Sequence, residues 1–262
     1  MIKTIKTKYS DNFSFYSNDN VIGRSLDLYG EYASNELEFL TSILNKNCVV
    51  WDIGSNIGIH AVAFATKANH VFCFEPNQHN LILLLKNTEH LENITVINAA
   101  VSDKNNTVLF QDFDPSVEGN FGSVKIGEGN RIGLSIKLDD WNFPKPDLIK
   151  LDVETFEWPA MQGMDQTIRN YSPLIYFEAH ETPDLPEIYD YLTSLGYSLY
   201  WCVVPNFNKN NINNNPTDIF ANSGTFSLCC VPSGLEHSLS MPKMSDRFDS
   251  AKKLIERNKL KD

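Results

Sequence analysis

The feature that most constrains this chain is the stretch of residues 49–60, Val-Val-Trp-Asp-Ile-Gly-Ser-Asn-Ile-Gly-Ile-His. Its apolar start predicts a buried strand over residues 48–51, and the apolar segment that follows predicts a helix beginning near Ile57. Between them, Gly54 and Gly58 allow the backbone to turn sharply and to approach a ligand closely. The first turn of a helix has free N–H groups, which favour a polar or anionic ligand. The stretch therefore predicts a strand–turn–helix unit that binds a ligand.

A second acidic anchor, Glu75, closes another apolar run and lies 23 residues after Asp52. An acid about 20 residues beyond a glycine-rich turn is placed to bind the two hydroxyls of a ribose. The turn reads Asp-x-Gly-x-Asn-x-Gly rather than Gly-x-Gly-x-x-Gly, and Asn56 is of a residue type that adopts positive φ at low cost. Because Asp52 places a negative charge beside the turn, the pattern favours a ligand with a positive amine, such as the methionine end of S-adenosylmethionine.

The predicted cofactor-binding residues lie in the turn and at the ends of the strands that follow it. Small residues after the third strand are included because they can border an adenine ring. The full set is Asp52, Gly54, Ser55, Asn56, Gly58, Glu75, Pro76, Ala100, Val101 and Asp152.

Apolar runs and helical periodicity alternate beyond the turn, which predicts an α/β fold with an open, doubly wound, mostly parallel sheet and helices on both faces. Strands are expected at residues 48–51, 70–74, 94–98, 148–153, 174–177, 198–204 and 225–231, and helices at 34–44, 57–65, 77–91, 158–170 and 186–195. A turn is expected at 27–32. An insertion at 104–146 interrupts the rhythm and is expected to contain short strands at 107–111, 123–126 and 134–138.

We expect one domain overall, with an N-terminal arm and cap helix (1–45), a core (46–235) and a C-terminal tail helix (236–262). The first 20 residues are expected to form an irregular arm or an edge hairpin. The asparagine-rich segment 206–215 has few apolar residues, and it is therefore predicted to be mobile or disordered. In the tail, a helical face made of Phe248, Ala251 and Ile255 is predicted to dock on the body or on a partner.

Charge and cysteine content restrict the partners and the compartment. Acidic residues (33) outnumber basic residues (22), and the net charge of −11 argues against nucleic acid or an anionic membrane as the main partner. The five cysteines form no Cys-x-x-Cys pair, which favours reduced thiols in a cytoplasmic enzyme. We expect neither a signal peptide nor a membrane span. The sequence leaves the oligomeric state open.

Acidic residues follow four of the expected strands, and in a doubly wound sheet ligands bind beyond the carboxyl ends of the strands. The candidate catalytic residues are Asp152, Glu154, Glu178 and His180. One of them can accept the proton of a hydroxyl acceptor during methyl transfer. Alternatively, Asp152, Glu178 and His180 can hold a divalent metal that acidifies the hydroxyl. The absence of tight ligand spacing favours the base, so no metal is predicted, and Lys150 is expected to pair structurally with an acid.

Two other classes of function remain open at this point. An oxidoreductase that uses NAD would share the strand–turn–helix unit and Glu75, but Asn56, Asp52 and the absence of a Tyr-x-x-x-Lys pair weaken it. A non-enzymatic binding protein on the same fold is the second alternative, and the presence of Asp52, Glu75 and Asp152 together speaks against it.

The chain resembles the FkbM family of S-adenosylmethionine-dependent methyltransferases over about residues 27–181. The matching segments are Asp-Ile-Gly-Ser-Asn-Ile-Gly (52–58), Phe-Glu-Pro (74–76), Asn-Ala-Ala-Val-Ser-Asp (98–103), Ile-Lys-Leu-Asp-Asp-Trp (136–141) and Leu-Ile-Lys-Leu-Asp-Val-Glu-x-Phe-Glu (148–157), with Gly-Glu-Tyr (30–32) upstream.

The resemblance implies a class I methyltransferase fold, with Asp52 and Gly54 near the methionine part of the cofactor and Glu75 on its ribose. It also implies transfer to oxygen, often to a hydroxyl of a sugar or of a natural product, so the expected partner is a small-molecule or glycan acceptor. Two positions depart from the family pattern: Thr155 stands where glycine is usual, and His60 where a small hydroxyl residue is common.

Overall fold

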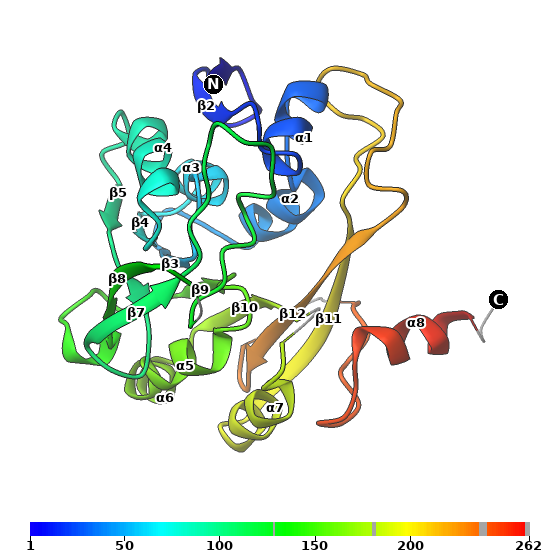
Figure 1. Ribbon diagram of the computed structural model, residues 1–262. Helices are drawn as coiled ribbons and strands as arrows, with labels where there is room; N and C mark the ends of the chain where they lie inside the picture. Colours follow the sequence, from blue (N-terminus) through cyan, green and yellow to red (C-terminus); the bar gives the residue numbers. More distant parts are fainter. Residues whose placement is uncertain (128, 180–181, 236–239, 260–262) are drawn as a thin grey trace.

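The computed structural model describes residues 1–127, 129–179, 182–235 and 240–259 (Figure 1). Seven strands form the main sheet in the order β11-β12-β10-β9-β3-β4-β5. Their bounds are β3 Val49–Ile53, β4 His70–Phe74, β5 Ile94–Ile97, β9 Leu148–Leu151, β10 Leu174–Glu178, β11 Tyr197–Pro205 and β12 Gly224–Pro232. The strands from β10 to β5 are parallel, whereas β12 is antiparallel to both β10 and β11. The predicted mostly parallel sheet is therefore confirmed.

Helices cover both faces of this sheet, with α2, α3 and α4 above it and α5, α6 and α7 below it in Figure 1. Their bounds are α2 Ser34–Ser42, α3 Ile59–Ala65, α4 Gln78–Thr88, α5 Glu157–Gln162, α6 Asp165–Tyr171 and α7 Leu185–Ser194. Side chains alternate between the faces along β3. Trp51 and Ile53 pack in the core with α5, α6 and α7, and Val50 packs in the core with α2, α3 and α4. Because helices pack on both faces, the sheet is doubly wound, as predicted. In the part of the chain that the structure describes, no helix is long and apolar enough to cross a bilayer.

The helix expected at residues 158–170 is two helices, α5 and α6, that meet at Gly163. A Cβ on Gly163 would lie 2.0 Å from the carbonyl oxygen of Ser102, so the chain comes close to the loop after β6 at this point. The Asp139 carboxylate caps the start of α6, because it accepts hydrogen bonds from the backbone N–H groups of Gln166 and Thr167. A cap from a distant loop is not visible in helical periodicity.

The N-terminal segment is more ordered than an irregular arm. Strands β1 (Ile2–Ile5) and β2 (Phe13–Tyr16) form an antiparallel hairpin, and every residue of β2 is buried. The turn expected at residues 27–32 is wrong for its first half, because helix α1 spans Ile22–Tyr29 and ends at Gly30, whose φ is 73°. The helix buries Ile22, Leu26 and Tyr29, which recur at helical spacing.

The insertion forms a small sheet of its own and a long crossing loop. The sheet has the order β6-β8-β7, from β6 Ala100–Val101, β7 Asn106–Phe110 and β8 Arg131–Ile136. The strand expected at 123–126 is absent among the described residues there, where Ile126 makes only an isolated bridge to Phe110. The loop between β7 and β8 reaches the N-terminal segment, where Gly119 exchanges backbone hydrogen bonds with Asn18 and Asn20 (Figure 1).

The asparagine-rich segment is not free of the body, contrary to prediction. It belongs to the long connection between β11 and β12, and it packs along α1 through hydrogen bonds and through the ring of Phe207, whose centroid lies 5.4 Å from that of Tyr29 (Figure 1). The Asn208 side chain donates to Glu31 at 2.8 Å, and the Asn213 backbone N–H donates to the carbonyl of Tyr29 at 3.2 Å. Low hydrophobicity therefore did not imply disorder here.

The tail helix α8 spans Ala251–Lys259 and docks on the body, as one of the two alternatives predicted, but only Ala251 of the predicted face takes part. Ala251 and Leu254 are buried in the main core, whereas Phe248 and Ile255 are exposed. The helix is held instead by Asp249, whose buried carboxylate accepts from the Trp201 indole and pairs with Arg257.

Candidate active site

Four neighbouring strands, β10, β9, β3 and β4, bring the predicted acidic residues to one edge of the sheet. Glu178, Asp152, Asp52 and Glu75 lie at or just beyond the carboxyl ends of these strands. A cavity of about 360 Å³ opens at this edge. The described residues that line it are Val21, Ile22, Tyr32, Gly54, Ser55, Asn56, Ile57, Ile59, His60, Asn120, Gly122, Ser123, Lys150, Asp152, Glu154, Glu178, Asn206, Ser223, Gly224 and Thr225.

The turn after β3 places three residues in the left-handed region, Gly54 at φ 81°, Asn56 at 51° and Gly58 at 93°. A Cβ on Gly54 would lie 1.9 Å from the carbonyl oxygen of Asp152, and one on Gly58 would lie 2.8 Å from a methyl carbon of Leu84. Both glycines are thus required by the packing of the turn against β9 and α4. Close approach to a ligand is a second possible reason only for Gly54, which lines the cavity.

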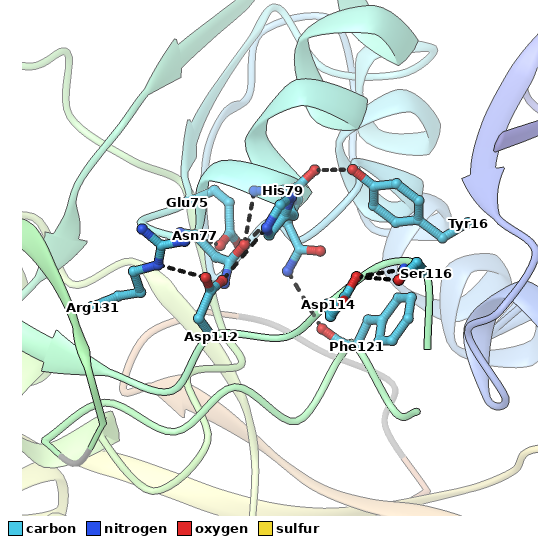
Figure 2. Close-up of polar contacts among 10 residues, drawn as sticks. Tyr16, Glu75, Asn77, His79, Asp112, Asp114, Ser116, Phe121 and Arg131 are labelled. Atoms are coloured by element: carbon cyan, nitrogen blue, oxygen red, sulfur yellow. Dashed lines mark hydrogen bonds and ion pairs between the residues drawn. The ribbon is translucent and has the colours of Figure 1, made fainter. Parts of the chain in front are cut away.

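Glu75 connects this turn to the start of α4. Its Oε2 accepts the backbone N–H of Asn56 and its Oε1 accepts that of Asn77, both at 2.8 Å. Figure 2 shows Glu75 and Asn77 near Asp112 of the insertion, which pairs with Arg131 and lies 3.7 Å from His79. Burial raises the pKa of Glu75 to about 7, against the two backbone hydrogen bonds that lower it.

Lys150 joins the acids of two strands. Its Nζ lies 3.7 Å from Asp52 Oδ1 and 3.2 Å from Asp152 Oδ2, and it is 3.5 Å from the carbonyl oxygen of Gly54. Burial disfavours the charged ammonium, but the two carboxylates outweigh burial and hold the pKa of Lys150 above its ordinary value. Asp52 is completely buried beside it, so a direct contact of Asp52 with an amine of the ligand stays a prediction.

Asp152 and Glu178 form a carboxyl pair with opposite shifts. Burial alone would raise the pKa of Asp152, but Lys150 outweighs it and keeps that pKa below the ordinary value. Burial and the neighbouring charges of Asp152 and Glu154 raise the pKa of Glu178 to about 8. A proton at neutral pH therefore resides on Glu178, in hydrogen-bonding contact with the Asp152 carboxylate.

The loop after β9 carries backbone strain at this site. Glu154 and Thr155 follow each other in the left-handed region, at φ 50° and 74°, and such a conformation is unusual for a β-branched residue such as Thr155. Glu157 lies beside this loop, where burial raises its pKa to about 7 against the nearby backbone N–H groups of Val153 and Thr155, which lower it. Its role was not predicted from the sequence.

Oxygen atoms of Asp152, Glu154 and Glu178 lie within 4.8 Å of one another. This donor set is suitable for proton transfer, and as a group of hard oxygen ligands it is also suitable for a divalent cation. His180, the fourth candidate, lies outside the described residues, so the metal set that includes it is not tested.

The remaining predicted cofactor-binding residues differ in whether they line the cavity. Ser55 and Asn56 line the cavity, and Ser55 Oγ donates to the carbonyl of Asp52 at 2.7 Å. Pro76 is half-buried at the start of the segment before α4. Ala100 and Val101 are buried in β6, where they pair with β8, and their contact with an adenine ring stays a prediction.

Several lining residues come from outside the strand–turn–helix pattern. Tyr32 precedes α2, Asn120 and Ser123 come from the insertion, and Asn206 and Thr225 come from the base of the β11–β12 connection. None was predicted. The one available signal was the long interruption at residues 104–146, because insertions of that length are often functional.

Comparison with known proteins identifies this arrangement. The Methyltransferase FkbM domain matches residues 52–199. The hexuronic acid methyltransferase AglP of Haloferax volcanii is 30% identical over 186 residues, which cover 69% of this chain and 74% of that protein. The alternatives of an NAD-dependent oxidoreductase and of a non-enzymatic protein find no support in these matches.

A solved structure shows the same fold. The FkbM methyltransferase of Methylobacillus flagellatus KT superposes with a TM-score of 0.50 at 18% identity. The superposition covers 79% of this chain and 51% of that chain, so this chain spans about half the length of that protein. The fold class predicted from the sequence, a class I methyltransferase sheet, is confirmed. By sequence and by fold, this chain belongs to the FkbM family of methyltransferases.

Proposed function

We propose that this chain is an S-adenosylmethionine-dependent O-methyltransferase whose acceptor is a hydroxyl of a sugar or glycoconjugate. The relative AglP, a hexuronic acid methyltransferase, supports a sugar acceptor. The observation that carries the proposal is the Asp152–Glu178 carboxyl pair, which lines the cavity beside the glycine turn. A hydroxyl must lose its proton as the new bond to carbon forms, and a carboxylate with a raised pKa is suited to receive it.

The residues around the turn fit the cofactor that the family implies. Each oxygen of Glu75 accepts one N–H and retains a second lone pair, which is capacity for the hydroxyls of a ribose. Gly54, Ser55 and Asn56 line the cavity where the methionine part would lie. When bound, the cofactor supplies an electrophilic methyl group on a sulfonium.

The two carboxyl groups have different roles toward the acceptor hydroxyl. Glu178, with a pKa of about 8, is the general base, because a base acts best when its pKa is near the operating pH. Asp152 stays ionised through Lys150, and its negative charge keeps the Glu178 pKa high. Its carboxylate can also accept a hydrogen bond from the acceptor hydroxyl and orient it toward Glu178.

Thermal unfolding with S-adenosylhomocysteine, and separately with NAD, tests the cofactor. Ligand at 100 times its Kd stabilises a protein by about 2.7 kcal/mol, which for this size corresponds to a midpoint shift of roughly 5 to 10 °C. We expect this shift with S-adenosylhomocysteine and none with NAD. Transfer of a labelled methyl group to a panel of methyl glycosides then tests the acceptor class, and no transfer to any of them would contradict the proposed reaction.

A further inference from the structure

We infer that the acceptor pocket selects an uncharged hydroxylated acceptor and discriminates against a sugar carboxylate, in contrast to the acceptor for which the relative AglP is named. The inference rests on the proposed function, because it assumes that the acceptor occupies the cavity beside Asp152 and Glu178. It follows from three properties of the lining: its acids, the state of its cations and its neutral polar groups.

The described lining of the cavity contains three carboxyl groups, those of Asp152, Glu154 and Glu178, within 4.8 Å of one another. A sugar carboxylate that entered this cavity would approach the carboxylate of Asp152, which Lys150 keeps ionised, and that of Glu154, whose negative charge acts on Glu178. Juxtaposed like charges are unfavourable at a binding surface and suppress the wrong partner. The acids therefore oppose an anionic acceptor.

Cations that could offset this charge are already engaged. Among the described lining residues, Lys150 and His60 are the basic ones. Lys150 is 2% exposed and lies between the carboxylates of Asp52 and Asp152, at 3.7 and 3.2 Å. His60 is nearly buried, with its Nε2 3.4 Å from Glu36 Oε1. Lys150 is thus shared between two carboxylates and His60 lies beside a third, whereas recognition of a carboxylate in a protein usually uses a cation with paired N–H donors.

Neutral amides and hydroxyls also line the cavity. Asn206 and Thr225 are joined by a hydrogen bond from Thr225 Oγ1 to Asn206 Oδ1 at 2.8 Å, and the Asn206 amide also contacts Ser223 Oγ at 3.3 Å. Asn120 and Ser123 add further polar groups from the insertion. Amides and hydroxyls both donate and accept, so they match sugar hydroxyls without requiring charge on the acceptor.

Three acceptors that differ only at C6 test this selectivity: methyl glucoside, the corresponding methyl glucuronide and the corresponding methyl 6-amino-6-deoxyglucoside. We expect kcat/KM for the glucoside to exceed that for the glucuronide at least about tenfold, which corresponds to about 1.4 kcal/mol. Binding of the same three sugars to the protein saturated with S-adenosylhomocysteine should follow the same order. Equal or better use of the glucuronide would overturn the inference while leaving the O-methyltransferase function intact.

The two measurements separate the inference from the function on which it rests. Binding of the glucoside without transfer to any sugar would contradict the proposed reaction but support the selectivity. Tighter binding of the glucuronide, or binding of none of the three, would contradict the selectivity whether or not transfer occurs.

A matched pair of variants tests the electrostatic cause. Thr225→Lys adds an ammonium to the neutral part of the lining, and Thr225→Met adds a chain of comparable bulk without charge. Both remove the hydrogen bond to Asn206, so both can reduce turnover. We expect only Thr225→Lys to shift the glucoside-to-glucuronide ratio of kcat/KM toward the glucuronide, by about tenfold. This result is expected if repulsion between like charges excludes the carboxylate. The same ratio in both variants would show that shape rather than charge excludes the carboxylate, and would overturn the stated cause.

Discussion

The backbone N–H of Asn56 donates a 2.8 Å hydrogen bond to Glu75 Oε2, which ties the glycine turn after β3 to the end of β4. Asn56 adopts a positive φ of 51°, so this bond helps to hold a backbone conformation that most residues avoid. Glu75, which we propose as the ribose ligand, therefore also shapes the turn that lines the cavity. Removing it should affect both properties.

Replacing Glu75 by alanine should weaken binding of S-adenosylhomocysteine by about 1 to 3 kcal/mol, the usual cost of losing a hydrogen bond to a charged group. The backbone N–H groups of Asn56 and Asn77 would also lose their acceptor. Titration calorimetry measures the affinity, and Glu89→Ala is a control on the exposed end of α4. An unchanged affinity in the Glu75 variant would refute its assignment to the ribose.

The pH dependence of turnover tests the base. Glu178 acts as a base only in its ionised form, and its pKa is raised to about 8 by burial and by Asp152. Because the ionised fraction grows as pH rises through this value, kcat/KM should increase about tenfold between pH 7 and pH 9. Glu178→Gln should be slow at every pH and lack this rise. A wild-type profile that is flat over this range would remove Glu178 from the proton transfer.

Chelation separates the base from the metal-assisted alternative. The carboxylates of Asp152, Glu154 and Glu178 are close enough to hold a cation, whereas the proposed function assigns Glu178 as a base that acts without one. We therefore expect full activity after treatment with EDTA and exchange into metal-free buffer. Loss of activity that Mg²⁺ or Mn²⁺ restores would instead support a metal that acidifies the hydroxyl.

Stability should depend on pH through Glu157. Burial raises its pKa from 4.5 to about 7, so the folded state holds this proton more tightly than the unfolded chain. The resulting stabilisation is fully present below about pH 4.5 and is lost as pH rises through about 7; it amounts to about 3 kcal/mol at most. Thermal unfolding midpoints should therefore fall between pH 5 and pH 8.

Glu157→Gln should reduce that fall, since its neutral amide has no proton to lose. Glu75 and Glu178 also have raised pKa values and remain in both proteins, so the difference between the two curves isolates Glu157. Glu92→Gln, at an exposed site, should leave the curve unchanged. Parallel curves for wild type and Glu157→Gln would show that Glu157 is ionised in the folded protein at low pH.

The gathering of acidic residues at one edge of the sheet could be predicted from the sequence. Alternating strands and helices form a parallel sheet, and its strands all end at the same edge, so no knowledge of side-chain contacts is needed. What the pattern could not supply was register. Asp52 and Lys150 are direct partners across β3 and β9, and this pairing explains why Lys150 sits between two carboxylates. Register depends on packing of both faces of a parallel sheet, and a continuously apolar strand carries little information about it.

The part of the site that came from loops was missed for a related reason. Asn120, Asn206 and Ser223 lie in segments whose polarity has no period, so nothing in their spacing indicated that they share a cavity with Asp152. Helix α1 is different, since Ile22, Leu26 and Tyr29 do follow a helical period. Its omission came from reading Gly30 as part of a turn rather than as the end of a helix.

Tyr29 anchors the β11–β12 connection above the cavity, which gives a prediction about acceptor binding. Its hydroxyl donates to the carbonyl of Thr217 at 2.6 Å and accepts the backbone N–H of Ile219 at 3.0 Å. The two ends of that connection contribute Asn206 and Ser223 to the cavity. Tyr29→Phe keeps the ring but removes both hydrogen bonds, so the connection should lose its fixed position over the acceptor.

The expected result for Tyr29→Phe is a rise in the acceptor KM of about 5- to 30-fold, which corresponds to one or two kcal/mol from two hydrogen bonds. Affinity for S-adenosylhomocysteine should stay at the wild-type value. In the described structure, the hydrogen bonds of Glu75 join the glycine turn to the start of α4 and do not involve the β11–β12 connection. Tyr171→Phe, which changes an exposed tyrosine at the end of α6, is the matched control. Steady-state kinetics and calorimetry on both variants measure the two effects. An equal loss of cofactor and acceptor affinity would show that Tyr29 supports the whole fold, whereas a selective rise in KM would identify the connection as the element that positions the acceptor.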